Sequence, residues 1–190
     1  MQSFQDTDHA FIDRLDPCII EDGSGRVVWD NEIYNFLSEP VPETASPELW
    51  RQAQLVAKQG LYKVVDGIYQ IRGFDLSNMT VIEGTKGIIV IDSSTSAECA
   101  NAALEIYRKN RGNKVVNGVL YTHSSADHFA GAEGILSRSE ASQVPVIAPH
   151  GSHEHAVSEN IFAGKLWLAE LDICMETNCP KVPGARSVPD

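Results

Sequence analysis

Four short runs of β-branched and other apolar residues follow one another between residues 61 and 92, and this succession constrains the fold more than any other feature. The runs read LYKVV, IYQIRG, MTVIEG and IIVID, and they are separated by Asp66-Gly67, by the polar stretch DLSN and by Lys86-Gly87. Apolar runs of this length between turn-forming residues are typical of β-strands. The sequence therefore predicts a meander of four strands.

After residue 92 the pattern changes to alternating helices and strands. Thr95 and Glu98 have the spacing of a capping box, and an Ala-rich stretch follows them. The predicted elements are strands over 115–121 and 144–148 and helices over about 97–110 and 128–138. Strand, helix, strand, helix and strand in succession indicate an α/β fold with parallel pairing.

The first 45 residues are rich in turns and predict an N-terminal arm over 1–45. Ser46 is suited to cap a helix and Pro47 to its first position, so a helix is predicted over about 47–59. Three aromatic residues are expected to lie in the core: Trp29, Trp50 and Tyr69.

The net charge, the length of the apolar runs and the cysteine spacing argue against several classes of protein. Lys and Arg number 15 against 26 Asp and Glu, a net charge of −11 that opposes binding to nucleic acid. No apolar run approaches the roughly 20 residues of a membrane span, and the chain does not start like a signal peptide, so we expect a cytoplasmic location. The four cysteines do not form a disulfide framework, and the last two are too far apart for most zinc knuckles: Cys18, Cys99, Cys174 and Cys179.

The segment YTHSSADHFAG at 121–131 carries the clearest chemical signal. Its three candidate metal ligands, His123, Asp127 and His128, lie within six residues, just after a predicted buried strand. Neutral imidazole and carboxylate groups suit Zn²⁺, and a tight turn lets neighbouring side chains reach two adjacent ions. A polar loop in which Asp127 caps a helix is the alternative. The position between a buried strand and a glycine-spaced helix favours the metal site.

This segment is similar to the His-x-His-x-Asp-His signature of the metallo-β-lactamase fold, and its surroundings resemble the alkyl sulfatase branch, which cleaves dodecyl sulfate and related esters. The resemblance covers about residues 25–164. It is carried by LWRQAQL at 49–55, GIYQIRGFDLSNMTVIEG at 67–84, GIIVIDSSTS at 87–96 and VPVIAPHGSHEHAVSENIFAG at 144–164. The resemblance implies an αβ/βα sandwich, two zinc ions that deliver an activated water, and a small-molecule alkyl sulfate as substrate.

The resemblance also assigns roles to individual residues. His123 would belong to the first metal and Asp127 and His128 to the second, while Asp92, at the end of a strand, matches a position that supports the metal-binding loop. Ser125 stands where the family has its middle histidine. A neutral hydroxyl is a poor zinc ligand, so we expect zinc binding to be weak or absent.

The resemblance stops after Gly164. The family continues for several times this length and supplies further ligands and sulfate-binding groups. We therefore interpret residues 46–164 as a partial, N-terminal half of the domain, and 165–190 as a divergent tail of the kind produced by a translated intron, a frameshift or a decayed gene. The alternative is a genuine tail that packs through its apolar residues, Leu166, Trp167, Leu168 and Leu171.

Half of a sandwich leaves one apolar sheet face uncovered. The expected consequence is low solubility, a homodimer formed through that face, or cover by the tail. A second group of histidines, His150, His153 and His155, could ligate a metal by its spacing, but the resemblance gives it no ligand role, so a structural or surface role is expected.

Two classes of function follow. The first is an alkyl sulfate hydrolase, impaired in this chain, and the alternative is a non-catalytic remnant or gene-model fragment. A thiolesterase of the glyoxalase II type shares the signature without the flanking stretches, and a nuclease of the superfamily conflicts with the negative charge.

Overall fold

The structure is a computed structural model that describes residues 8–162 of the chain. These residues belong to two units, of which the first ends at Ser152 and the second begins at His153. The predictions for the tail over 165–190, including Cys174 and Cys179, lie outside the described residues. None of the described helices is long and apolar enough to cross a membrane.

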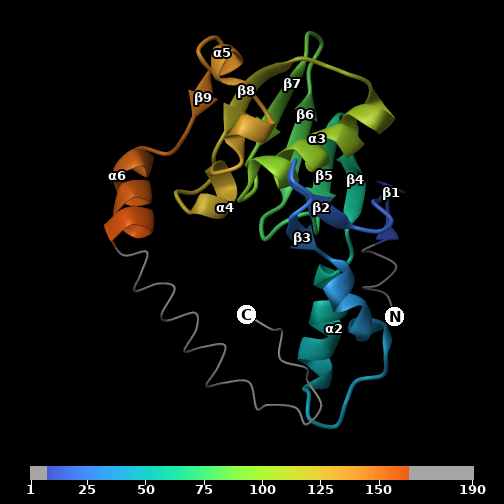
Figure 1. Ribbon diagram of the computed structural model, residues 1–190. Coiled ribbons are helices and arrows are strands. Elements are labelled where there is room, and N and C mark those ends of the chain that lie inside the picture. The colour runs from blue at the N-terminus through green and yellow to red at the C-terminus, as the bar shows by residue number, and fades with distance from the viewer. Residues whose placement is uncertain (1–7, 163–190) are drawn as a thin grey trace. The chain divides into compact units, whose positions relative to one another are not determined.

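The elements follow the chain in the order shown in Figure 1. The strands are β1 (Phe11–Asp13), β2 (Ile19–Glu21), β3 (Val27–Asp30), β4 (Gly60–Val65), β5 (Ile68–Arg72), β6 (Met79–Glu83), β7 (Ile88–Ile91), β8 (Val116–Leu120) and β9 (Val146–Ile147). The helices are η1 (Glu32–Ser38), α2 (Pro47–Val56), α3 (Ala97–Arg111), α4 (Ala126–Phe129), η2 (Ala132–Gly134), α5 (Arg138–Ala141), α6 (Ser152–Val157) and η3 (Ser158–Phe162).

Seven strands form one mixed sheet in the order β1-β4-β5-β6-β7-β8-β9. The meander β4 to β7 is antiparallel, as the four apolar runs predicted. β8 pairs parallel with both β7 and β9, because α3 and the segment from α4 to α5 return the chain to the same end of the sheet. The α/β prediction and the parallel pairing are confirmed.

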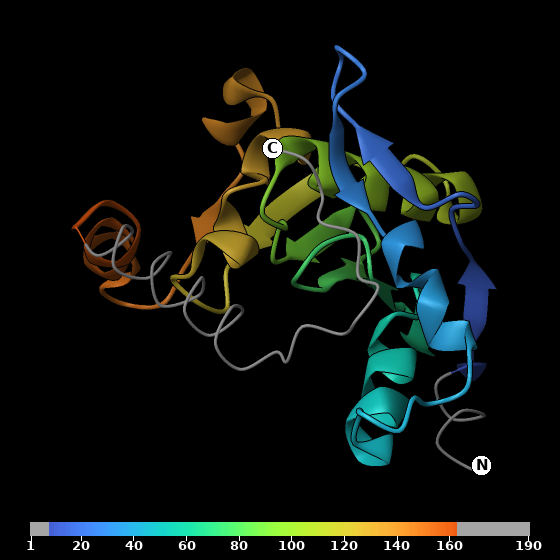
Figure 2. The same cartoon turned by 60° about the horizontal axis from the view of Figure 1, so that its bottom comes forward.

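Helix α3 and the β2–β3 hairpin cover one face of this sheet (Figures 1 and 2). The core lies between them, and Tyr69 of β5 meets Tyr107 of α3 edge to face at 5.8 Å between ring centroids. Cys18 and Cys99 are buried in this core as free thiols. The N-terminal arm therefore contributes to the core through its hairpin and to the sheet through β1.

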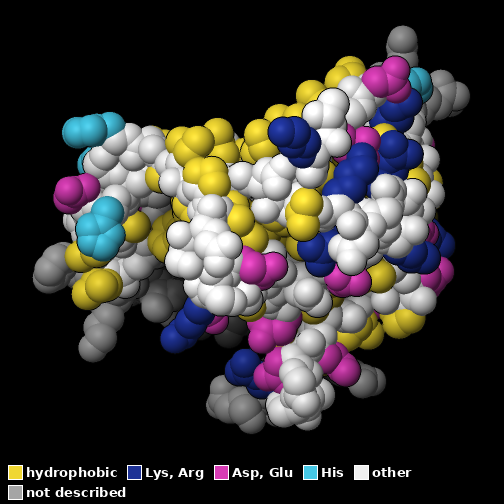
Figure 3. Space-filling view, turned by 90° about the horizontal axis from the view of Figure 1, so that it is seen from above, with side chains coloured by type: hydrophobic (Ala, Val, Ile, Leu, Met, Phe, Trp, Pro, Cys, Tyr) yellow, Lys and Arg dark blue, Asp and Glu magenta, His cyan; other side chains and the backbone are white. Residues whose placement is uncertain are grey.

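The opposite face of the sheet is not covered by any described element of the first unit. Alternate strand residues point away from α3, and Ile89 is 44% exposed while its neighbours Ile88 and Val90 are buried. Yellow side chains form a band along the upper margin of the space-filling view, on the side of the sheet away from α3 (Figure 3). The apolar residues of this open face are Ile68, Ile82, Ile89, Ile91, Leu120 and Ile147.

Three local predictions need correction. Ser96 rather than Thr95 caps α3, because its side chain accepts the Cys99 N–H while Thr95 bonds to Asp75. The helix expected over 128–138 is broken into α4, η2 and α5, since Gly131 and Gly134 bring the backbone against the α3 segment and Ser137 starts a new capping box.

The third correction concerns an aromatic residue. Trp50 is half-buried on α2 against Phe36 of η1 and is not part of the core, whereas Tyr69 is buried and Trp29 packs against the core as expected. The helix that carries Trp50 begins at Pro47 as predicted and ends at Val56.

Glu83 ties the end of β6 to the last turn of α3. Its carboxylate accepts hydrogen bonds from the Tyr107 hydroxyl at 2.8 Å and Arg111 Nε at 3.2 Å, and Lys114 Nζ lies 3.1 Å away. Burial opposes ionisation, but the hydrogen bonds from Arg111, Tyr107 and Lys114 outweigh it and lower the pKa of Glu83 to about 2. A carboxyl whose pKa is lower in the folded than in the unfolded chain stabilises the fold at pH values above its unfolded pKa.

We therefore expect Glu83 to contribute to acid sensitivity. Its stabilisation is fully present above pH 4.5 and is lost as the pH falls toward 2. Glu83→Gln should lower the free energy of unfolding by about 2 kcal/mol at pH 7, the value of hydrogen bonds to charged groups, and by much less near pH 2. Urea unfolding at both pH values measures the difference. Glu105→Gln, which removes an exposed partner of Arg108, is the control, and equal losses at both pH values for Glu83→Gln would contradict the prediction.

Candidate metal centre

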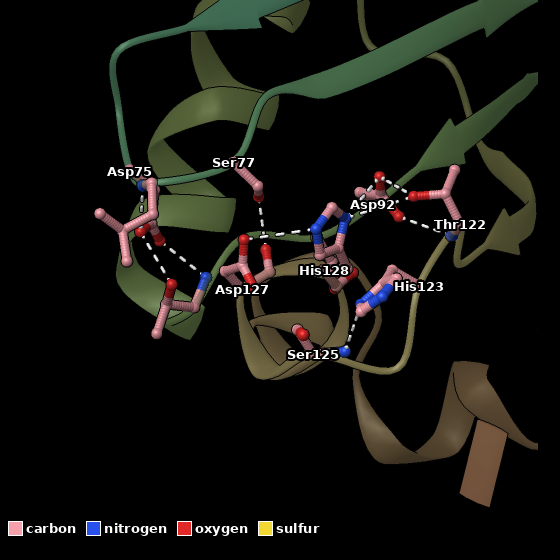
Figure 4. A network of polar contacts seen from close by, with 11 residues as sticks. Asp75, Ser77, Asp92, Thr122, His123, Ser125, Asp127 and His128 are labelled. Carbon is pink, nitrogen blue, oxygen red and sulfur yellow. Dashed lines mark hydrogen bonds and ion pairs between the residues drawn. The ribbon is translucent and has the colours of Figure 1, made fainter. Parts of the chain in front are cut away.

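The residues singled out in the signature lie at the carboxyl ends of the parallel strands. β7 ends at Ile91, directly before Asp92, and β8 ends at Leu120, three residues before His123. The chain then turns through Ser125 into α4, which carries Asp127 and His128 (Figure 4). Carboxyl ends of adjacent parallel strands meet at one edge of a sheet, where α/β folds place functional groups.

Asp92 is the most firmly held of these side chains. It is buried, and its carboxylate accepts the Thr122 N–H at 2.8 Å and the Thr122 hydroxyl at 2.6 Å. Its Oδ2 also lies 2.9 Å from His128 Nδ1. The φ of Asp92 is 59°, a left-handed conformation that a residue other than glycine keeps only when its surroundings enforce it. These contacts connect the ends of β7 and β8 to the His128 ring.

The contact with Asp92 determines which nitrogen His128 presents. An ionised carboxylate only accepts, so Nδ1 of His128 donates to Asp92 and the neutral ring keeps its lone pair on Nε2. That Nε2 lies 3.3 Å from Asp127 Oδ2. Two acceptors at this distance are placed so that a proton or a metal cation can bridge them. The edge of a zinc tetrahedron with bonds of about 2.0–2.1 Å is about 3.3–3.4 Å, so this pair fits two corners of one zinc site.

His123 lies beside His128 but presents a different nitrogen. The ring centroids are 5.5 Å apart and the rings are tilted by 54°. His123 Nδ1 accepts the backbone N–H of Ser125 at 3.0 Å, so the proton of the neutral ring is on Nε2. Metal binding through Nε2 would therefore require the contact with Ser125 to break.

The donor set is thus smaller than a complete zinc site. Structural and catalytic zinc sites use three or four protein ligands. Over residues 8–162 no group of three or more His, Cys, Asp or Glu side chains is placed to hold one ion. Asp127 and His128 supply two donors at a suitable separation, and Ser125 occupies the turn between them and His123. His150, His153 and His155 are all exposed, as expected.

The β5–β6 loop, which the sequence identified only as a polar link between strands, also reaches this centre. Asp75 is buried and bonds to Thr95, just beyond the end of β7. The Ser77 hydroxyl donates to the backbone carbonyl of Asp127. The only signal in the sequence was that both residues lie in a stretch shared with the alkyl sulfatases, because periodicity says nothing about which loops meet.

Comparisons with a family pattern, with related sequences and with solved structures all give the same family. The sequence pattern of the Metallo-beta-lactamase superfamily matches residues 72–186. A linear primary-alkylsulfatase from Pseudomonas sp is 45% identical over 166 residues, covering 85% of this chain and 25% of the relative. An alkyl/aryl-sulfatase of Saccharomyces cerevisiae is 43% identical, covering 86% of this chain and 26% of the relative.

The structure is also similar to a solved one. A stereoselective inverting sec-alkylsulfatase from Pseudomonas sp matches with a TM-score of 0.80 and 44% identity, over 86% of this chain and 26% of that chain. The chain therefore spans about a quarter of the length of these relatives. Together with the mixed sheet and the loop after β8, these matches show that the chain belongs to the metallo-β-lactamase superfamily, with relatives named alkylsulfatases.

Proposed function

We propose that this chain forms the part of an alkyl sulfate hydrolase that carries the metal-binding loop, and that by itself it holds one zinc ion weakly. The observation that carries the proposal is the Asp127 Oδ2 to His128 Nε2 pair at 3.3 Å, with Asp92 behind the imidazole. Relatives at 43–45% identity are named alkylsulfatases, which supports alkyl sulfate esters as the substrate class.

Each residue has a separate task in this proposal. Asp127 and His128 would hold zinc, and Asp92 would orient His128 and raise the basicity of its Nε2, as carboxylate partners of ligating histidines do. Zinc, when bound, lowers the pKa of a coordinated water and so supplies a nucleophile at neutral pH. At the neighbouring metal position, Ser125 supplies no imidazole. The His123 ring there already accepts the Ser125 N–H, so it is not ready to bind an ion.

We propose further that the 190-residue chain does not turn over alkyl sulfates. The two protein donors found among residues 8–162 do not complete a catalytic zinc site, which has three plus an open position. The alternative is a non-catalytic remnant that binds at most one metal weakly, and a direct measurement of zinc affinity tests whether this loop forms a site. The cytoplasmic location stays a prediction from the sequence.

The open face of the sheet supports a homodimer as a second part of the proposal. Five strands from β5 to β9, about 4.8 Å apart and up to five residues long, present roughly 300 Å². No Asp or Glu lies among the outward residues of β5 to β9, so negative side chains would not meet directly across this face. We propose a second copy of the chain as the occupant of this apolar face, in a weak dimer.

Ser125→His tests the zinc proposal. A histidine at this position would give the first metal position, assigned to His123, a second imidazole, and should tighten zinc binding by at least the roughly 10–100-fold that changes in the outer shell of a metal site produce. Isothermal titration with zinc measures the affinity of wild type and variant. Ser139→His, which adds an imidazole on the exposed helix α5, should leave the affinity at the wild-type value.

The same proteins separate binding from catalysis. Zinc-loaded wild type and Ser125→His should both fail to hydrolyse dodecyl sulfate. Turnover that disappears on chelation would overturn the claim that the chain is inactive. Equal zinc affinities for Ser125→His and Ser139→His would argue against a zinc site in this loop.

A further inference from the structure

The short helix α4 leaves its carbonyl groups in need of outside partners. Helix α4 has four residues, and the last carbonyls of any helix lack intrahelical donors. The carbonyls of Ser125 and Ala126 accept N–H groups from the same turn. The carbonyls of Asp127 and His128, the two residues that face each other at 3.3 Å, receive theirs from other loops.

Two loops supply these donors. The Ser93 N–H, from the loop after β7, donates to the His128 carbonyl at 2.8 Å. The Ser77 hydroxyl, from the β5–β6 loop, donates to the Asp127 carbonyl (Figure 4). The first donor is main chain, which substitution does not remove. The second is a side chain, so one of the two hydrogen bonds that orient the Asp127–His128 peptide, the other being from the His128 N–H to the Ser125 carbonyl, comes from a replaceable hydroxyl.

The β5–β6 loop is itself anchored, so Ser77 is a fixed donor. Asp75 Oδ2 accepts the Thr95 N–H at 2.7 Å, and Asp75 Oδ1 accepts the Thr95 hydroxyl at 2.8 Å and the Leu76 N–H at 2.6 Å. The carboxylate is only 8% exposed. On the other side of the loop, Phe74 is buried in the core. Residues 74, 75 and 77 thus attach the loop to the core, to the β7–α3 loop and to α4.

We infer that Ser77 is a positioning residue for metal binding: it fixes the Asp127 peptide so that the carboxylate stays within reach of His128 Nε2. The peptide carbonyls of Asp127 and His128 are then both held, and the two side chains project from an immobilised turn. Loss of the hydroxyl leaves the Asp127–His128 peptide held only by the bond from the His128 N–H to the Ser125 carbonyl, so the two donors keep the separation that zinc requires less well. This inference rests on the proposed zinc site.

Zinc affinity measured by competition with a chromophoric chelator tests it. Ser77→Ala should weaken binding by about 10–100-fold, the range observed when outer-shell partners are lost. Ser77→Thr keeps a hydroxyl and should bind like wild type. Ser142→Ala removes the same kind of bond, from a serine hydroxyl to the Ser139 carbonyl at 2.8 Å, away from the site, and should also bind like wild type. Equal affinity of Ser77→Ala and wild type would overturn the inference.

A second readout needs no metal. In the zinc-free protein the ring resonances of His128 should shift in Ser77→Ala and stay in place in Ser77→Thr and Ser142→Ala, because only the first removes a hydrogen bond to the Asp127–His128 peptide. If wild type binds no zinc but His128 responds in this way, the proposed zinc site fails while the positioning contact stands. If His128 does not respond, the positioning role is refuted whatever the zinc affinity.

Discussion

Replacing Gly131 with alanine is expected to remove most of the free energy of unfolding of this chain. A Cβ at residue 131 would overlap the carbonyl oxygens of Ser93 and Ser96 and would lie 3.0 Å from the Ala100 Cβ. These oxygens are main chain, so the clash cannot be relieved by a rotamer change. Losses above about 4 kcal/mol are expected for overpacking of this severity, against a total stability of about 5–15 kcal/mol for a typical domain.

Gly131 has a φ of −82°, which alanine also adopts, so the loss would come from the close approach alone. Gly118→Ala is the matched control, because its Cβ would have no neighbour closer than 3.8 Å and alanine suits a strand better than glycine. Urea unfolding followed by circular dichroism compares the two variants. A free energy of unfolding of Gly131→Ala within about 1 kcal/mol of the wild-type value would show that the α3 segment and the loop after β8 do not meet as described.

The second large effect is expected at the open face. Ile89→Glu places a carboxylate at its centre, and in a symmetric dimer the two copies would bring like charges together without partners. Because bringing like charges together costs several kcal/mol, the dissociation constant of the dimer should rise by more than about tenfold. Sedimentation at several concentrations measures it. Folding should be retained, since Ile89 is already 44% exposed.

Leu49→Glu on α2 is the control for this variant. Leu49 is 72% exposed, so the same addition of charge occurs away from the sheet and should leave association unchanged. A wild-type chain that stays monomeric at all concentrations would refute the dimer. A shortened chain ending at residue 162 that associates when the full chain does not would assign the face to the residues after it.

The predictions share a physical origin in how the centre is held. Gly131 lets the loop after β8 approach the loop after β7, and Ser77 attaches the β5–β6 loop to the same turn. Asp127 and His128 are neighbours in sequence, but their useful separation of 3.3 Å depends on three loops that are distant in sequence. Stability and metal affinity should therefore respond to different residues of one network.

Periodicity and turn chemistry in the sequence determined the strands of the meander, the start of α2, the extent of α3 and the parallel order of β7, β8 and β9. These are local properties, set by which residues can alternate faces, cap a helix or end a strand. Spacing and resemblance also identified His123, Asp127 and His128 as one group and Ser125 as the residue that departs from the signature.

Only the tertiary structure decided what each of these side chains can do. The break of the 128–138 helix follows from glycine backbones pressed against α3, and the transfer of the cap from Thr95 to Ser96 follows from Asp75, twenty residues away. The tautomer of His128 follows from Asp92, and the contact that holds Asp127 comes from Ser77. No local pattern encodes such contacts, because they depend on which loops a folded sheet brings to the same edge.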